Sequence, residues 1–319
     1  MKLLLAPIQG VTIAEYRNSY DKFFGGFDGY YAPFISPTTK EETHPSFFND
    51  VLPEVNSNTL SLVPQLLGND GNNFRDYAAT IVNMGYKEIN WNIGCSFSIV
   101  TKKKKGAGIL PHPDMIKRVL DEVCKDTNYD LTVKMRLGMN HTDEGIKVIE
   151  SLNDYPLSGV MIHARTGIQQ YNGHVDLDAF QTLYSKSKHK MTYNGDIYTY
   201  EDYKKIQNRF PELDSFMLGR GALIDPFLAS TIKGDDIPTD QKLKIITSFH
   251  HAIYNHYKKN KPRENHFLNK MKEFWTYTHV HLDPENQFIK RIRLSQTNEA
   301  YLKVVKEILK DTNQWIEKM

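Results

Sequence analysis

The chain has 319 residues, of which 40% are hydrophobic and 24% are charged, a composition typical of a folded globular protein. No segment approaches the run of about 20 apolar residues that a transmembrane helix needs. The apolar start MKLLL ends at Pro7, which is too short for a secretory signal. Two cysteines, Cys95 and Cys124, exclude a disulfide framework and favour a reducing, cytoplasmic location. The formal net charge of +2, taken alone, argues against a nucleic-acid partner.

Short apolar segments rich in β-branched and aromatic residues recur about every 25 to 35 residues along the chain. They are expected to be strands, at residues 3–5, 30–35, 60–67, 88–91, 131–135, 159–162, 190–193 and 215–218. Segments with helical periodicity lie between most of them, at residues 74–84, 114–123, 144–152 and 200–208. Asp114 is expected to cap the second of these helices. Eight strands alternating with helices predict a parallel (β/α)8 TIM barrel.

The alternation of strands and helices stops after Ile232. A polar, turn-rich segment at residues 233–240 follows and is typical of a domain boundary. Only helical periodicity remains beyond it, at residues 243–257, 267–281 and 299–316. We therefore expect a catalytic barrel over residues 1–238 and a small helical domain over residues 239–319.

Polar residues and glycines follow the expected strands. The active site of such a barrel is built at the carboxyl ends of its strands. The segments found there, from the first expected strand to the last, are APIQG, PQLLG, NWNIGC, VKMRLG, IHART, NGD and LGRG. Polar groups at a buried rim must be satisfied or used, so their convergence predicts a functional site.

These side chains suit a planar cofactor that carries a phosphate. Glycines in NGD and GRG would let backbone amides approach the phosphate after the seventh and eighth strands. Gln65 and Asn194 supply amide donors and acceptors, and Lys134 can stabilise negative charge on a reduced heteroaromatic ring. We therefore expect a flavin. No GxGxxG motif follows a strand, so a tightly bound dinucleotide is not expected.

The order and spacing of these motifs resemble the tRNA-dihydrouridine synthase family. The resemblance runs from about Leu3 to Pro226 and rests on APIQGVT with Arg17, PQLLGND, INWNIGC, VKMRLG, IHART, YNGDI and MLGRGAL. In the tail, the segment Asn269–Trp275 is similar to the family's basic-aromatic helix. The combination of GCS, NGDI and GRGAL is specific, whereas NGDI or GRG alone also occurs in other flavin barrels.

The resemblance implies an FMN enzyme that reduces the C5–C6 double bond of uridines in tRNA to dihydrouridine, with NADPH or NADH as reductant. Cys95 would be the catalytic general acid and Asn92 would position the uracil. Arg136 and Arg165 resemble the family's pocket arginines and would face the substrate or the flavin. By motif match, the flavin would be held by Pro7, Ile8, Gln9, Gln65, Lys134, His163, Asn194, Gly195, Asp196, Gly219 and Arg220.

A thiol suits the role that the resemblance implies for Cys95. Hydride addition to C6 of the uracil places negative charge toward C5 and O4, so a proton must reach C5 from a fixed donor. A cysteine, with a reference pKa of about 8.5, stays protonated at neutral pH yet releases its proton readily. Ser96 stands where the family has a proline, which puts the rigidity of this loop in doubt more than its chemistry. The basic, glycine-rich segment at residues 99–108 is expected to close over RNA.

Each of these residues also has a structural interpretation. Cys95 could be a buried thiol, His163 a hydrogen-bonded core histidine, and Lys102–Lys105 a solvated surface. Lys134 could be a rim ion-pair partner or a Schiff-base lysine, as in barrel aldolases. The aromatic residues of the tail could pack in its core or stack on bases; they are Phe274, Trp275 and Tyr277.

Two other functions remain open at this point. A flavin barrel acting on a free pyrimidine, like dihydroorotate dehydrogenases, would not need a basic tail. An RNA-binding barrel that has lost catalysis would be colourless. No metal site is expected, because the tail histidines lack cysteines or a carboxylate at metal-ligand spacing. No extended apolar interface is evident, so we expect a monomer.

Charge is distributed unevenly between the two expected domains. Residues 1–238 contain 25 Lys and Arg against 29 Asp and Glu, whereas residues 239–319 contain 15 against 9. A basic tail can gather a polyanion, with Lys102–Lys105 expected at the pocket mouth. The near-neutral total is therefore compatible with tRNA as the partner, and binding is expected to weaken as salt is added.

Overall fold

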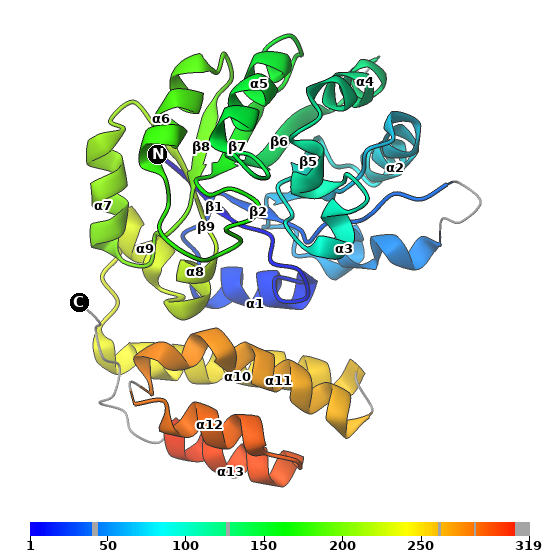
Figure 1. The fold of residues 1–319 in the computed structure, drawn as a ribbon. Coiled ribbons are helices and arrows are strands. Elements are labelled where there is room, and N and C mark those ends of the chain that lie inside the picture. Colours follow the sequence, from blue (N-terminus) through cyan, green and yellow to red (C-terminus); the bar gives the residue numbers. More distant parts are fainter. Residues whose placement is uncertain (40–43, 126–127, 261–262, 284, 310–319) are drawn as a thin grey trace. The chain divides into compact units, whose positions relative to one another are not determined.

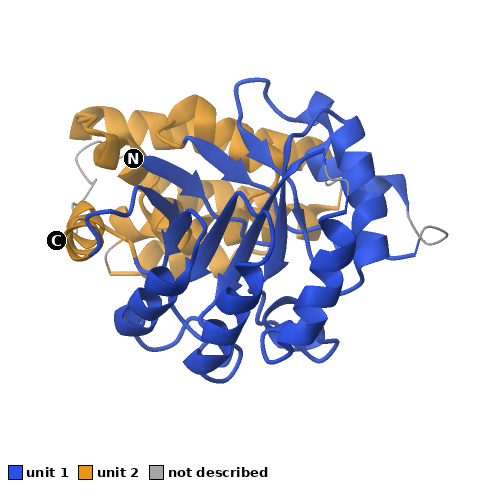
Figure 2. Cartoon of the chain, turned by 90° about the horizontal axis from the view of Figure 1, so that it is seen from above, with its two compact units in different colours: residues 1–9, 28–196, 210–217 blue, residues 10–27, 197–209, 218–319 orange. Residues whose placement is uncertain are grey.

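The computed structural model describes residues 1–39, 44–125, 128–260, 263–283 and 285–309. The chain forms two compact units (Figure 2). The first comprises residues 1–9, 28–196 and 210–217, and the second comprises residues 10–27, 197–209 and 218–319. The expected assignment of a catalytic barrel to residues 1–238 and a tRNA-binding domain to residues 239–319 stays a prediction.

The first unit is built on a nine-stranded parallel sheet. The strand order is β3-β2-β1-β9-β8-β7-β6-β5-β4, and every pairing is parallel. The strands are β1 (Lys2–Leu5), β2 (Gly29–Tyr31), β3 (Leu62–Val63), β4 (Gln65–Leu66), β5 (Glu88–Ile93), β6 (Asp130–Arg136), β7 (Gly159–His163), β8 (Met191–Asn194) and β9 (Ser215–Leu218).

The sheet curls into a barrel through the two short strands at its ends. Only Pro64 separates β3 from β4, and proline has no backbone N–H to donate to a neighbouring strand. Because β3 pairs with β2 and β4 pairs with β5, residues 62–66 take one strand position and join the two ends of the sheet. A parallel bridge between Ile35 and Leu66 adds to this closure. The nine strands thus occupy eight positions of a nearly closed barrel, and the predicted (β/α)8 fold is confirmed.

Helices of the first unit lie outside its strands (Figure 1). The long ones are α2 (Gly71–Asn83), α4 (Pro113–Val123), α5 (Thr142–Leu152) and α6 (Leu177–Lys186). The short ones are η2 (Pro45–Val51), η3 (Pro53–Val55), α3 (Ser98–Thr101) and η4 (Gly106–Ile109). The predicted cap at Asp114 is wrong, because Pro113 already takes the first helical position after His112. Asp114 instead lies in the first turn, where its negative charge interacts favourably with the helix dipole.

The barrel interior is packed with side chains that alternate inward along the strands. One buried cluster joins residues from β1, β2, β3, β7 and β9 with Ala6, which follows β1, and consists of Leu4, Ala6, Tyr31, Val63, Met161 and Met217. A filled interior of this kind holds the strands at fixed spacing. Side chains at the carboxyl ends of the strands are therefore presented from a rigid support.

The second unit is helical. Its elements are α1 (Ala14–Phe23), α7 (Tyr200–Arg209), α8 (Arg220–Ile224), α9 (Leu228–Lys233), α10 (Thr239–Asn260), α11 (Glu264–Thr278), η5 (His279–His281), α12 (Gln287–Leu294) and α13 (Asn298–Ile308). Phe249 of α10 centres an aromatic cluster, since its ring packs against those of Tyr16, Phe24 and Phe274. The helix expected at residues 299–316 corresponds to α13 as far as Ile308, and residues 310–316 lie outside the described residues. No described helix is long and apolar enough to span a membrane.

Candidate active site

The register of four neighbouring strands places predicted site residues side by side. Asn92 of β5 lies opposite Lys134 of β6, Arg136 lies opposite His163 of β7, and His163 lies opposite Asn194 of β8. All but Lys134 are buried, and Lys134 is half-buried. These residues therefore form one polar cluster at the carboxyl rim of the first unit.

Cys95 lies in a tight turn directly after β5. The Asn92 side-chain oxygen Oδ1 accepts hydrogen bonds from the backbone N–H of Gly94 at 3.0 Å and of Cys95 at 2.9 Å. The carbonyl of Gly94 accepts a bond from Arg136 Nε at 3.0 Å, and the carbonyl of Cys95 accepts one from the Ala107 N–H at 2.8 Å. The backbone on both sides of the thiol is thus fixed by hydrogen bonds.

The segment after Cys95 folds into the short helices α3 and η4. Gly106 has a φ of +55°, and a Cβ at this position would lie 2.5 Å from the Cys95 carbonyl oxygen, so only glycine fits here. Gly106 therefore packs closely against the backbone of Cys95. Phe97 and Ile99 are exposed by 60% and 74%, which leaves apolar side chains at the outer surface of the segment.

The surroundings of Cys95 keep its thiol protonated. Burial raises the pKa of Cys95 above its usual value, against the opposing effects of the Phe97 backbone, Arg136 and Lys134. A protonated thiol beside cations is a proton donor whose conjugate base would be stabilised by those cations. At Cys124, burial and the nearby Asp121 raise the pKa to about 11.

Lys134 is coupled to a side-chain amide. Its Nζ donates to Asn194 Oδ1 at 3.1 Å, and Asn194 Nδ2 in turn donates to the Met217 carbonyl at 2.7 Å, which fixes the orientation of the amide. Burial, together with the neighbouring charge of Arg136, lowers the pKa of Lys134 to about 7. The charged form is therefore disfavoured here, and an anion bound beside Lys134 would favour it.

The buried guanidinium of Arg165 forms an ion pair with the partly exposed carboxylate of Asp196. The guanidinium is 2% exposed and makes a bidentate contact with the carboxylate, with Nη1 to Oδ1 at 2.8 Å. It also contacts His163 Nε2 at 3.3 Å and donates to the Gly173 carbonyl at 2.6 Å. Asp196 has a φ of +39°, an uncommon conformation for a residue other than glycine, and the ion pair helps to hold this turn after β8.

Breaking this pair is expected to destabilise the protein strongly. Asp196→Ala leaves the Arg165 guanidinium buried without its counter-ion, which costs on the order of 3 kcal/mol of unfolding free energy. Asp154→Ala is the matched control, because Asp154 pairs with Lys117 at 3.6 Å on the exposed surface and such pairs contribute less than about 1 kcal/mol. Urea unfolding of both variants measures the difference. Equal losses would show that the Arg165 pair is not buried in the folded protein.

The remaining predicted residues lie at the ends of two other strands. Pro7, Ile8 and Gln9 directly follow β1. Gly219 and Arg220 follow β9 but belong to the second unit, where the Arg220 guanidinium lies 5.5 Å from the centre of a tyrosine ring. Their expected place at the flavin phosphate therefore stays a prediction.

Three residues that the sequence analysis did not single out join the site. Gln65 Nε2 donates to Asn90 Oδ1 at 2.7 Å, and Asn90 Nδ2 donates to Thr132 Oγ1 at 3.0 Å. Thr132 in turn donates to Glu88 at 2.9 Å. The available signal was the alternation on β5, because Asn90 and Asn92 are two residues apart and must point to the same face.

The donor set fits a flavin. The dioxopyrimidine edge of the ring presents N–H and C=O groups, for which the amides of Gln65 and Asn194 and the Lys134 amine are suitable partners. At Gly195 a Cβ would lie 2.8 Å from Val175, so glycine keeps the turn after β8 tight. A metal is not indicated in the described part of the chain, where no group of three or more His, Cys, Asp or Glu side chains is arranged to hold one.

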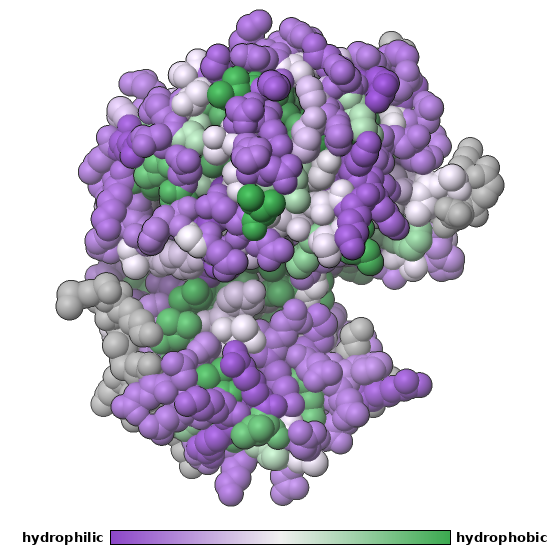
Figure 3. Space-filling model, in the orientation of Figure 1, coloured by the Kyte–Doolittle hydropathy of each residue, from purple (hydrophilic) through white to green (hydrophobic). Residues whose placement is uncertain are grey.

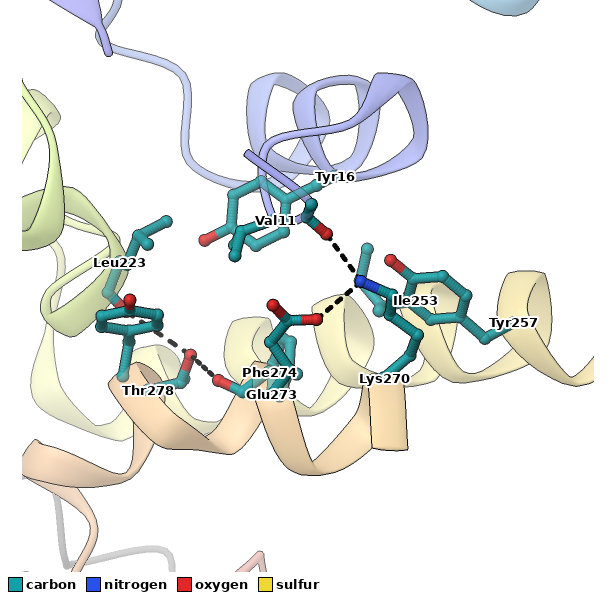
Figure 4. A pocket seen from close by; sticks show the side chains of 11 residues that line it. Val11, Tyr16, Leu223, Ile253, Tyr257, Lys270, Glu273, Phe274 and Thr278 are labelled. Carbon is teal, nitrogen blue, oxygen red and sulfur yellow. Dashed lines mark hydrogen bonds and ion pairs between the residues drawn. The ribbon is translucent and has the colours of Figure 1, made fainter. Parts of the chain in front are cut away.

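A separate small pocket lies within the second unit, between residues of α1, α10 and α11 (Figure 4). Lys270 Nζ donates to the Gly10 carbonyl at 2.9 Å and to Glu273 Oε2 at 2.7 Å. The buried Tyr16 hydroxyl has no hydrogen-bond partner among the described residues. The pocket volume of about 20 Å³ suits about one water molecule and excludes a nucleobase.

The aromatic residues of α11 pack inside the second unit. Trp275 is fully buried and donates from Nε1 to the Tyr301 hydroxyl at 2.9 Å, and Phe274 is 6% exposed. The core interpretation of these two residues is therefore confirmed, and stacking on an RNA base is excluded for them. Tyr277 is half-buried.

The first unit is a parallel barrel whose carboxyl rim carries a lysine, side-chain amides and a thiol, a set that suits a TIM-barrel oxidoreductase. Residues 4–313 match the family model of dihydrouridine synthase (Dus), and the chain belongs to this family. The resemblance seen in the motifs and the expected class of enzyme are thereby confirmed. Membership implies flavin-dependent chemistry driven by NAD(P)H.

Curated relatives support this assignment. A tRNA-dihydrouridine(16) synthase from Neisseria meningitidis serogroup B is 30% identical over 239 residues, which cover 73% of this chain and 71% of the relative. A protein of the same name from Vibrio parahaemolyticus is 24% identical over 308 residues, 92% of each chain. A tRNA-dihydrouridine(47) synthase [NAD(P)(+)]-like protein from Arabidopsis thaliana is 31% identical over 173 residues, 50% of this chain and 24% of that protein.

Solved structures share the fold. Histamine dehydrogenase from Rhizobium sp. 4-9 matches with a TM-score of 0.54 at 10% identity, covering 73% of this chain and 45% of that chain. Morphinone reductase in complex with tetrahydroNAD matches with a TM-score of 0.52 at 9% identity, covering 73% and 86%. At these identities the likeness supports the barrel fold alone.

Proposed function

We propose that this protein reduces uridine in tRNA to 5,6-dihydrouridine, with FMN as the flavin and NADPH as the reductant. The observation that carries the proposal is the position of Cys95, a protonated thiol in a fixed turn beside the lysine and amide cluster. The family match and the names of the relatives favour tRNA over a free pyrimidine as the substrate. A bound flavin would supply the hydride for C6 of the uracil.

Cys95 is the proposed proton donor to C5. Its thiol releases a proton as negative charge develops on the uracil, and Lys134 and Arg136 stabilise the thiolate that remains. Asn92 holds the turn of Cys95 through Oδ1, which makes it a positioning residue in addition to a proposed contact of the uracil.

The flavin ring is proposed to lie against Gln65, Lys134 and Asn194. Lys134 bears its charge when a reduced, anionic ring is beside it, because the ring offsets the cost of burial that lowers the pKa of the free amine. The other flavin contacts that the motifs imply are proposed at Pro7, Ile8, Gln9, His163, Gly195, Asp196, Gly219 and Arg220. Arg136 and Arg165 use several donors on backbone carbonyls and on Asp196, so we propose that they shape the pocket wall.

We propose that tRNA binds through its phosphate charges, which exposed lysines and arginines attract, and through bases that stack on exposed aromatic side chains. The face of the molecule in Figure 3 is mostly hydrophilic with separate hydrophobic spots. In the first unit, Phe97 and Tyr171 are exposed and can stack on bases, and Lys102–Lys105 can bind phosphates. In the second unit, Lys290 and Arg293 of α12 are exposed cations. We propose that the enzyme acts as a cytoplasmic monomer.

The test is a map of dihydrouridine in tRNA from cells that lack this protein. Because the Neisseria and Vibrio relatives are named for position 16, loss of dihydrouridine is expected at that position. Supplying the intact gene should restore the modification, and supplying the Cys95→Ala gene should not. An unchanged map would refute the proposed function, and loss at another position would refute the proposed target.

A further inference from the structure

A chain of side-chain hydrogen bonds runs through the barrel below Cys95, all of it within the first unit. Asn92 Nδ2 donates to Gln65 Oε1 at 2.7 Å, and Gln65 Nε2 donates to Asn90 Oδ1 at 2.7 Å. Asn90 Nδ2 donates to Thr132 Oγ1 at 3.0 Å, and Thr132 Oγ1 donates to Glu88 Oε1 at 2.9 Å. The chain thus connects the turn of the proposed acid to the first residue of β5.

Both ends of this chain are fixed. At the upper end, the backbone N–H groups of Gly94 and Cys95 can only donate, so Asn92 must present its oxygen to them. At the lower end, Glu88 Oε1 accepts from Thr132 and from the Tyr31 hydroxyl at 2.8 Å. Every amide between the two ends therefore has one satisfactory orientation.

Burial makes an unpaired group in this hydrogen-bond chain costly in free energy. Gln65 and Asn90 are fully buried, Thr132 is 4% exposed and Asn92 is 8% exposed. An unpaired amide at such positions costs more free energy than one hydrogen bond contributes. If Thr132 no longer accepts from Asn90, a flip of Asn90 turns its Nδ2 toward Gln65, which must then flip as well. Asn92 would follow and present Nδ2 to the N–H groups that hold Cys95.

We propose that Thr132 and Glu88 are positioning residues that set the amide orientations of Gln65 and Asn92, and thereby the turn of Cys95 and the atoms that Gln65 would present to a flavin. This inference rests on the proposed function of Cys95 and Gln65. Glu88 is the acceptor at the end of the hydrogen-bond chain. Because the Thr132 hydroxyl donates its proton to Glu88, its oxygen is left to accept from Asn90 Nδ2. Neither residue is among those proposed to contact the substrate or the flavin.

Thr132→Val tests the proposal, because valine has the shape of threonine without its hydroxyl. The full-length protein as purified is treated with iodoacetamide, and the alkylation rate of Cys95 relative to Cys124 is measured by mass spectrometry. We expect Thr132→Val to change this ratio by about tenfold and to weaken FMN binding in a fluorescence titration. Thr132→Ser keeps the hydroxyl and should return both quantities to within about twofold of the original protein.

Two further variants separate positioning from loss of stability. Thr192→Val removes a buried hydroxyl of β8 that donates to Ser215 at 2.8 Å and is not part of the hydrogen-bond chain. This variant should leave the ratio of the Cys95 and Cys124 alkylation rates unchanged. Glu88→Leu should resemble Thr132→Val, and the double variant should be no worse than either, because both interrupt one chain. Glu88→Gln retains an acceptor oxygen and should behave like the original protein.

The proposal is overturned if Thr132→Val leaves both the cysteine ratio and FMN affinity unchanged, or if Thr132→Ser fails to restore them. It is also overturned if Thr192→Val alters the ratio as strongly as Thr132→Val does. The cysteine ratio needs no tRNA. Failure of the proposed function would instead appear as absence of dihydrouridine formation by the original protein, so the two failures are distinguishable.

Discussion

Cys95→Ala is expected to lower the rate of dihydrouridine formation by a factor of about 10²–10⁴, the range that a positioned general acid contributes. The other cysteine, Cys124, is the residue that ends α4 and is not part of the turn after β5. The flavin contacts proposed at Gln65, Lys134 and Asn194 do not involve the thiol. Flavin binding and reduction by NADPH should therefore proceed at nearly the original rate.

A two-step measurement checks this expectation. Flavin reduction is followed by the loss of its visible absorbance, and reoxidation of the reduced flavin by tRNA is followed separately. Only the second step should slow in Cys95→Ala, and Cys124→Ala should leave both steps unchanged. If Cys95→Ala modifies tRNA at the normal rate, the proton comes from another group. If flavin reduction also fails, Cys95 has a part in building the pocket that its contacts do not explain.

The barrel could be predicted from the sequence because each strand carries a local signal. Residues 88–93 and 130–136 carry apolar side chains that are buried in the sheet, such as Ile89, Trp91 and Val133, and the spacing of these segments by intervening helices predicts parallel pairing. The division at Pro64 did not follow from this signal. It depends on β3 and β4 pairing with different neighbours, which only the closed barrel determines.

The site residues divide in the same way. Cys95, Lys134 and Asn194 could be proposed as site residues because each lies at or near the carboxyl end of a strand, within a short motif. Asn90 and Thr132 could not, because their role depends on the register between β5 and β6, where they lie opposite each other. The hydroxyl of Thr132 has meaning only when the Asn90 amide is known to face it at 3.0 Å. The part of the site that depends on contacts between strands therefore cannot be predicted from local sequence motifs.

Lys134→Met is expected to have opposite effects on stability and on flavin binding. Burial lowers the pKa of Lys134 from 10.5 to about 7, so the folded protein binds this proton less tightly than the unfolded chain does. The original protein therefore gains unfolding free energy as pH rises from about 7 toward 10.5. Methionine removes the free-energy cost of burying the amine but also loses the hydrogen bond to Asn194. The flavin-free variant should be more stable by about 1 kcal/mol, a rise of about 2–4 °C in Tm.

The stability gain should be largest at pH 7 and below and should shrink toward pH 10, since deprotonation then removes the same cost in the original protein. Flavin binding should move the other way. A charged hydrogen bond to the reduced ring contributes about 1.5–3 kcal/mol, so affinity for reduced FMN should fall by about 10- to 100-fold.

Lys147→Met is the matched control, because Lys147 is an exposed lysine of α5 in the same unit. Thermal unfolding across pH and a flavin midpoint potential measure the two effects of Lys134→Met. If Lys134→Met alone shows a more negative potential and a higher Tm, Lys134 stabilises the reduced flavin and lowers the stability of the flavin-free protein. An unchanged potential would remove Lys134 from the ring, and a lower Tm would show that its amine is stabilised within the fold by its hydrogen bond to Asn194.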